Sequence, residues 1–301
     1  MAENRKVWMN GELVPWCDAT VPLMSHGFSR GSGIFEAFGV HESPEGPAAF
    51  RMDDHLRRLS RSAELLEMEL GYTEAEIASA VAETVRANGT GRGIVKVMAY
   101  WSQETVAQLV LDAKLDVAIF AIGKGSDLKI DDTSSISACL SKWRKLHPET
   151  AQVEAKACAN YLNAYLARRD AVNRGFDVGL MVGTDGLLAE GSIESAFVVK
   201  AGVLRTPPLG RILSSISRRT IIEVAPTLDI PVEESPLRAG ALFDADEIFT
   251  SHTGVKVHPV DRFEDRKLDA PGPVTSRLIK LVEGILEFRD TRFSHYFQSL
   301  S

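Results

Sequence analysis

A lysine in an unusually small and apolar stretch is the first residue of this sequence that could do chemistry. Lys156 lies in "AKACANYLNAYL" (155–166), among alanines, a cysteine and tyrosines, and the stretch contains no acidic residue. An ammonium group that loses hydration in such surroundings is disfavoured relative to the neutral, nucleophilic amine. Most lysines near the start of a helix are nevertheless exposed to solvent. Lys156 is therefore a candidate that other stretches must support.

Glu190, in "LLAEGSIESAF" (187–197), is a carboxylate in an equally unusual place. It ends a short apolar segment and precedes a glycine, where an uncharged polar residue would cost less free energy. A carboxylate at this position either caps a turn or holds a cationic group of a ligand. The local sequence leaves both interpretations open.

Two further stretches are typical of anion sites. In "LGRILSSISRRT" (209–220) a glycine and three serines precede a predicted helix, whose first N–H groups favour a phosphate, and Ser217 can add a hydroxyl. "SHTGV" (251–255) ends a predicted strand in a turn whose N–H groups can form a similar nest. Arg58 lies off the apolar side of a predicted helix and could reach a ligand. The alternatives are an ordinary cap, an ordinary turn and a solvated arginine.

Composition and the remaining motifs exclude several classes of function. A net charge of −7 without a long basic run argues against a protein that binds nucleic-acid phosphates. "RGSGIFEAFG" lacks the third glycine of a dinucleotide fingerprint and the order of a serine-hydrolase motif, and the seven histidines show no zinc spacing. We therefore expect neither a nucleic-acid partner nor a metal site.

The length of the apolar runs and the spacing of the cysteines indicate the cellular compartment. The longest apolar run, 117–122, is far too short to cross a bilayer, and the first eight residues lack the apolar core of a secretory signal. Three scattered cysteines form no CxxC pair. We expect a cytoplasmic protein with no membrane contact.

The elements that must position these residues follow from hydrophobic periodicity. Strands and helices are mixed without regular βαβ alternation, which favours an α+β fold. In the first half, Asn10-Gly11 predicts a tight hairpin over 7–14. The other predicted strands are 33–40, 48–51, 93–100, 115–122, 135–140, 177–183, 187–191, 196–200, 202–206 and 246–252, and the predicted helices are 52–70, 73–88, 160–174, 216–227 and 274–288.

A stretch rich in Gly, Asp and Ser, "GKGSDLKIDDTS" (123–134), is typical of an interdomain connection. We therefore expect a small α+β domain over 1–122, a linker over 123–134 and a large domain over 135–301.

Taken together, the chain resembles the fold-type IV pyridoxal-phosphate (PLP) enzymes, most closely the branched-chain aminotransferases. Six stretches carry the resemblance in the order typical of the family, and they span nearly the whole chain. They are "VWMNGELVPWCDATVPLMSHGFSRGSGIFEAF", "RMDDHLRRLSRSAELL", "EAKACANYL", "GLLAEGSIESAFVV", "LRTPPLGRILSSISRRTII" and "DADEIFTSHTGVKVHPV". The resemblance implies a two-domain fold like that of D-amino acid aminotransferase, with the cofactor in the interdomain cleft.

The resemblance also implies a role for each candidate around the cofactor. Lys156 would form the internal aldimine with the aldehyde and later carry the proton between the substrate Cα and the cofactor C4′. Glu190 would keep the pyridine nitrogen protonated, and Tyr161 would hydrogen-bond the phenolic oxygen. If Asn160 caps the following helix, Lys156 and Tyr161 can face one cleft.

The phosphate and the substrate have their own implied residues. The phosphate maps onto Arg58, Ile216, Ser217 and Thr253. The N–H groups of Gly254 and Val255 would bind the substrate carboxylate, and Phe35 would line the side-chain pocket.

At two positions the chain departs from the family pattern. Branched-chain aminotransferases commonly have an arginine at the position of Lys96 and a tyrosine at that of Arg30. A lysine keeps the charge but loses the two-pronged grip on a carboxylate, so these residues could relocate the binding of a dicarboxylate. The alternative is that both only pair with local acids.

We therefore predict a PLP-dependent, homodimeric aminotransferase that moves the amino group of an apolar, branched-chain amino acid to 2-oxoglutarate. A D-amino acid or (R)-amine transaminase and an aminodeoxychorismate lyase are the alternatives on the same scaffold. A non-catalytic relative that binds a phosphorylated metabolite is the alternative from another class.

Overall fold

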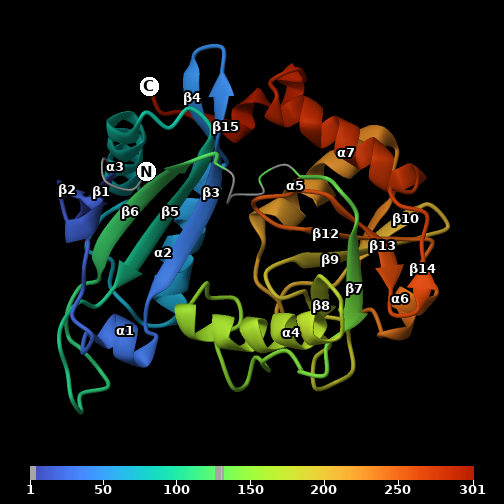
Figure 1. The fold of residues 1–301 in the computed structure, drawn as a ribbon, viewed down its shortest axis with the longest axis horizontal. Helices are drawn as coiled ribbons and strands as arrows, with labels where there is room; N and C mark the ends of the chain where they lie inside the picture. Colours follow the sequence, from blue (N-terminus) through green and yellow to red (C-terminus); the bar gives the residue numbers. More distant parts are fainter. Residues whose placement is uncertain (1–4, 126–129, 131) are drawn as a thin grey trace. The chain divides into compact units, whose positions relative to one another are not determined.

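The computed structural model describes residues 5–125, 130 and 132–301. Residue contacts divide the chain into two units (Figure 1). Unit 1 comprises residues 1–128, 155–159 and 287–301, and unit 2 comprises 129–154 and 160–286. Part of the predicted linker, residues 126–129 and 131, lies outside the described residues.

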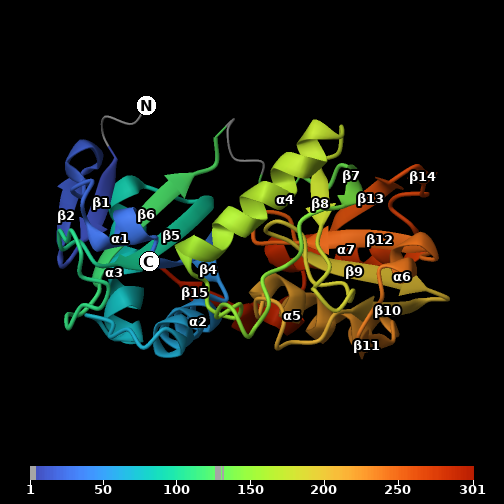
Figure 2. The ribbon, with the colours of Figure 1, turned by 90° about the horizontal axis from the view of Figure 1, so that it is seen from below.

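Unit 1 is built on an antiparallel sheet with the strand order β15-β4-β3-β5-β6-β1-β2. Helices α2 and α3 cover one face, where residues such as Phe38, Leu59 and Val81 form the main core (Figure 2). The strands of this sheet are β1 (Lys6–Met9), β2 (Glu12–Pro15), β3 (Ile34–Ser43), β4 (Gly46–Phe50), β5 (Gly93–Tyr100), β6 (Asp116–Gly123) and β15 (Phe297–Ser299). The helices of the unit are η1 (Trp16–Asp18), α1 (His26–Arg30), α2 (Met52–Leu65), α3 (Glu74–Asn88) and η4 (Thr291–Tyr296).

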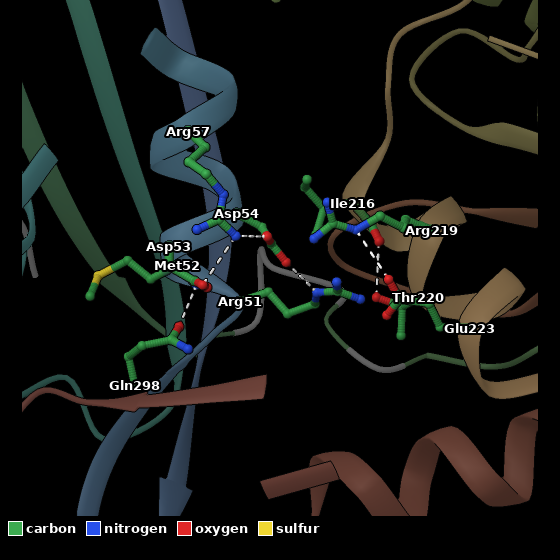
Figure 3. A network of polar contacts seen from close by, with 10 residues as sticks. All are labelled: Arg51, Met52, Asp53, Asp54, Arg57, Ile216, Arg219, Thr220, Glu223 and Gln298. Carbon is green, nitrogen blue, oxygen red and sulfur yellow. Dashed lines mark hydrogen bonds and ion pairs between the residues drawn. The ribbon is translucent and has the colours of Figure 1, made fainter. Parts of the chain in front are cut away.

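The start of α2 is fixed by charged and polar side chains. Figure 3 shows the Asp54 carboxylate between the guanidinium groups of Arg51 and Arg57, with 2.6 Å from Arg51 Nε to Asp54 Oδ2. The Met52 N–H donates to Gln298 Oε1 at 2.7 Å, so β15 is tied to the same helix start. Acidic residues in a first turn also suit the positive end of the helix dipole. These contacts place α2, and with it Arg58, firmly against the sheet.

Unit 2 is built on a mixed sheet with the strand order β11-β10-β9-β12-β13-β7-β8, to which β14 adds beside β13. Its core includes Leu180, Val198, Ile248 and Phe263. The strands are β7 (Ile136–Leu140), β8 (Val178–Leu180), β9 (Ser195–Lys200), β10 (Val203–Thr206), β11 (Val232–Glu234), β12 (Glu247–Ser251), β13 (His258–Phe263) and β14 (Arg266–Lys267). The helices are α4 (Tyr161–Asn173), α5 (Ile216–Val224), η3 (Ala225–Leu228), α6 (Gly240–Phe243) and α7 (Pro273–Leu286), and a further short helix, η2 (Cys158–Asn160), precedes α4.

α5 begins with a side-chain cap. Ser215 Oγ accepts the N–H of Arg218 at 3.2 Å. In the same helix, shown in Figure 3, Thr220 Oγ1 donates to the Ile216 carbonyl and Arg219 pairs with Glu223. The cap serves the third residue of the helix, so the N–H groups of the first two residues, Ile216 and Ser217, receive no bond from it.

Most predicted helices and strands are present, and they differ from prediction where pairing between distant residues sets their ends. The predicted helix over 52–70 ends at Leu65, because Glu67 adopts a positive φ of 54° and Leu70 instead pairs with Leu115. The predicted strand over 187–191 is wrong: its residues make only isolated bridges, to Val182, Arg238 and Ser195.

Two segments that the sequence analysis placed in the large domain pack in unit 1. Residues 155–159 lie against β3, and 287–301 include β15, which pairs with β4. Both pairings join residues more than a hundred positions apart, which local periodicity does not register. None of the helices in the described ranges has the length and hydrophobicity needed to cross a bilayer.

Candidate active site

Lys156 is held by backbone pairing with the first residues of β3 in the unit 1 sheet. Ala157 pairs antiparallel with Ile34, and the Phe35 N–H donates to the Lys156 carbonyl at 3.1 Å. Lys156 therefore stands opposite Phe35, and side chains in opposed positions share a face of a sheet. The Lys156 Nζ lies 4.6 Å from the Phe35 ring centroid. The amine thus rests on an aromatic surface at a fixed position.

A second lysine amine, that of Lys96, lies over the Phe35 ring. Lys96 lies on β5, opposite Ala37 and diagonal to Phe35, and its Nζ is 4.9 Å from the ring centroid. Phe35 therefore has one lysine amine from each side of its strand. The structure brings together three residues that the sequence analysis assigned separately: Lys156, Phe35 and Lys96.

Arg58 is buried against β3 rather than exposed as a solvated arginine. Its Nε donates to Glu36 Oε1 at 2.6 Å and its Nη2 donates to Glu36 Oε2 at 2.7 Å. His55 Nδ1 lies 2.7 Å from the same Oε2. Burial alone would raise the pKa of Glu36, but the charges of Arg58 and then His55 outweigh burial and lower that pKa from 4.5 to about 2. Sequence reasoning missed Glu36 and His55, although Glu36 stands out as a charge on an apolar strand.

Glu190 is held in unit 2 by two donors. Lys145 Nζ lies 2.5 Å from Glu190 Oε1, and the Leu213 N–H donates to Glu190 Oε2 at 3.3 Å. Both side chains of the ion pair are largely buried. Lys145 was missed by the sequence analysis because it lies forty-five residues before Glu190 in the sequence.

Three serine hydroxyls close to Glu190 are buried and have no hydrogen-bond partner among the described residues. They belong to Ser192, Ser195 and Ser251, and the last two are 3% and 0% exposed. Ser195 bridges Glu190 on one side and pairs with Ser251 on the other. Glu190, Ser195 and Ser251 thus form one row across neighbouring segments, with side chains on one face. Because an unsatisfied buried hydroxyl is costly, this row fits a polar ligand beside the carboxylate.

The remaining candidates of unit 2 occupy helix ends and turns. Ile216 and Ser217 form the first turn of α5, and both are buried. Tyr161 is the first residue of α4. Asn160 holds the cap position but its side chain makes no cap bond; its Nδ2 donates to the Gln152 carbonyl at 3.0 Å. The proposed capping by Asn160 is therefore wrong, although the helix does begin where it was expected.

The turn that follows β12 contains Thr253, Gly254 and the buried Val255. The Gly254 N–H donates to His252 Nδ1 at 3.1 Å. Burial, followed by the charge of Lys256, lowers the pKa of His252 to about 3, so the ring is neutral and its Nδ1 can accept. For a substrate to use the Gly254 N–H, it has to replace this internal bond.

Arg30 lies at the exposed end of α1, where its Nη2 donates to the Val106 carbonyl at 2.9 Å. Beside α1, unit 1 contains an apolar cavity of about 390 Å³, lined by Phe28, Gly33, Met98, Phe120 and Cys158 among others. Cys158 lies two residues after Lys156. Arg30 therefore binds the loop that contains Val106, and it pairs with no acidic residue in the part of the chain that the structure describes.

Each unit by itself contains groups that suit parts of a coenzyme with an aldehyde, a cationic ring and a phosphate. Unit 1 offers the amine of Lys156, and a buried arginine, Arg58. Unit 2 offers the Glu190 carboxylate, with the row of hydroxyls that lack partners, and the start of α5 for an anion.

Comparisons with known proteins agree with this chemistry. The model of the amino-transferase class IV family matches residues 33–263. The branched-chain-amino-acid aminotransferase of Pseudomonas aeruginosa is 31% identical over 91% of this chain and 90% of its own length, and that of Escherichia coli K12 is 32% identical over 93% and 92%.

Solved structures show the same similarity. The branched-chain aminotransferase of Thermoproteus uzoniensis, with norvaline, has a TM-score of 0.93 at 34% identity over 99% of both chains. That of Thermobaculum terrenum, in its PLP form, has a TM-score of 0.92 at 29% identity over 100% of both chains.

Proposed function

Since this chain belongs to the class IV aminotransferases, we propose that it uses PLP to move the amino group of a branched-chain amino acid to 2-oxoglutarate. The observation that carries the proposal is the placement of Lys156, whose amine is fixed over the Phe35 ring by backbone pairing with β3. The relatives named for branched-chain substrates support leucine, isoleucine and valine as donors.

Lys156 performs the proton transfer. Bound PLP supplies an electron-withdrawing ring that makes the substrate Cα–H acidic. Lys156 Nζ would hold the coenzyme at its aldehyde, and once free it would move the proton between the substrate Cα and the coenzyme C4′. A neutral amine is needed for this step.

Glu190 would hold the ring nitrogen in its protonated form, and Tyr161 would donate to the phenolic oxygen. The ion pair with Lys145 keeps the Glu190 carboxylate in place for the first of these contacts. Arg58, Ile216, Ser217 and Thr253 bind the phosphate, which suits a helix start and an arginine.

Substrate binding involves the remaining candidates. Phe35 contacts the substrate side chain, and the turn at Gly254 and Val255 binds the α-carboxylate. Lys96 supplies a positive charge beside Phe35 that suits the second carboxylate of 2-oxoglutarate. An unchanged KM for 2-oxoglutarate in a Lys96→Met variant would remove this assignment.

The apolar surface of unit 1 supports the proposed homodimer. Val106, Leu109 and Val110 are 83%, 69% and 79% exposed on the loop that Arg30 binds. Such a group of large exposed apolar side chains is typical of a protein interface. We expect a second copy of the chain to cover it, and Arg30 to act in the assembled dimer. Sedimentation velocity should show a dimer that Leu109→Asp converts to monomer; a monomeric parent protein would contradict the assignment.

The cytoplasm is the proposed compartment, because Cys17, Cys139 and Cys158 are all free thiols.

Borohydride labelling tests the proposed function directly. The protein loaded with PLP is reduced with borohydride, digested and analysed by mass spectrometry. The phosphopyridoxyl group is expected on the peptide that contains Lys156, with no label on Lys96 or Lys145. Label on another lysine, or a protein that takes up no PLP, would refute the proposal.

A further inference from the structure

The guanidinium of Arg58 donates hydrogen bonds to the carboxylate of Glu36, which is buried in unit 1. We propose that Glu36 is a positioning residue for the coenzyme phosphate: it fixes the plane of the Arg58 guanidinium, so that this cation meets the phosphate in one orientation. The inference rests on the proposed function, because it concerns the phosphate of the same coenzyme.

The grip is bidentate. Arg58 Nε and Nη2 donate to the two different oxygens of Glu36, at 2.6 and 2.7 Å. A two-pronged bond between planar groups fixes orientation as well as distance. Glu36 is 0% exposed and lies on β3, so its own position is set by the sheet. The two hydrogen bonds therefore hold the Arg58 guanidinium in a position that the sheet sets.

The backbone of Arg58 is tied to the segment that contains Lys156. Ser62 Oγ donates to the Arg58 carbonyl at 2.8 Å, and the Lys156 N–H donates to the same Ser62 Oγ at 3.0 Å. One serine thus links the helix turn of Arg58 to the segment of Lys156. These two residues are assigned to the phosphate and the aldehyde of one molecule, so their separation must match the length of the coenzyme.

His55 completes the cluster from the preceding turn of α2. Its Nδ1 lies 2.7 Å from Glu36 Oε2, the oxygen that Arg58 Nη2 also uses. Glu36 is thereby held by two partners on one helix and cannot turn towards another. A carboxylate that served only to neutralise Arg58 would not need this second contact.

The experiment compares two coenzyme forms. We expect Glu36→Gln to raise the Kd of the apoprotein for pyridoxal 5′-phosphate roughly ten- to hundredfold, as loss of charge-assisted hydrogen bonds does. The Kd for pyridoxal, which lacks the phosphate, should change less than about threefold. Equilibrium dialysis measures both. The matched control is Glu42→Gln, an exposed glutamate on the same strand, which should change neither Kd.

The direction of the change in Kd distinguishes an effect of Glu36 on the orientation of Arg58 from an effect of its charge on the phosphate. Removing the negative charge of Glu36 would by itself favour binding of a phosphate dianion. Tighter or unchanged binding of pyridoxal 5′-phosphate would therefore overturn the proposal, and so would equal weakening of both ligands, which indicates general loosening. If Glu36→Gln does not fold, Glu36→Asp keeps the charge with a shorter reach, and it must show the same selective loss. A parent protein that binds no pyridoxal 5′-phosphate would refute the proposed function instead.

Discussion

Replacing Lys156 with alanine is expected to lower kcat for transamination by at least about 10⁴-fold, because one amine provides both the covalent bond to the coenzyme and the proton transfer. The pairing of Ala157 with Ile34 and the bond from the Phe35 N–H to the carbonyl of residue 156 do not involve the lysine side chain, so the variant should fold normally. Rates are measured with leucine and 2-oxoglutarate at saturating PLP. Thermal unfolding of the same preparation tests whether the loss of activity arises from the missing amine and not from a loss of folded protein.

Two further variants define the role of the amine. Lys142→Ala removes an exposed lysine that pairs with Asp170, and it should retain the parent rate. In Lys156→Ala, a small external amine such as methylamine should restore part of the proton transfer. Transamination at a rate close to that of the parent in Lys156→Ala would contradict the assignment of this residue.

The resemblance predicted the family, the coenzyme and the α+β fold-type IV architecture, and the comparisons confirm all three. Local signals were also reliable. The Asn10-Gly11 hairpin forms with both residues at positive φ, and Ser215 caps α5 just before Ile216 and Ser217. Turn and cap chemistry depends on adjacent residues, so a single sequence contains it.

Contacts that join distant residues could not be predicted in this way. The partners of Arg58 and Glu190 are Glu36 and Lys145, twenty-two and forty-five residues away in the chain. The amines of Lys96 and Lys156 meet at Phe35 only because β3 has β5 on one side and residues 155–159 on the other. Periodicity predicts which face a side chain occupies but not which strand lies beside it.

Glu190→Gln is expected to have the second largest effect, a loss of about 10²- to 10³-fold in kcat. The amide keeps the shape of the side chain, but its single oxygen can accept from Lys145 or from the Leu213 N–H and not from both. It carries no charge, however, so it no longer favours the protonated ring nitrogen on which proton removal from the substrate depends. Retention of PLP should change far less than kcat, because Arg58 and the start of α5 are untouched.

The same substitution leaves the Lys145 ammonium without a charged partner in a largely buried position. We expect the free energy of unfolding to fall by about 1–3 kcal/mol, the usual cost of a lost hydrogen bond to a charged group. Adding Lys145→Met removes the unpaired charge and should restore most of the stability but none of the rate. Thermal unfolding and initial rates on Glu190→Gln, Lys145→Met and the double variant separate the two effects. Recovery of the rate in the double variant would mean that Glu190 serves the fold through Lys145 and not the coenzyme ring.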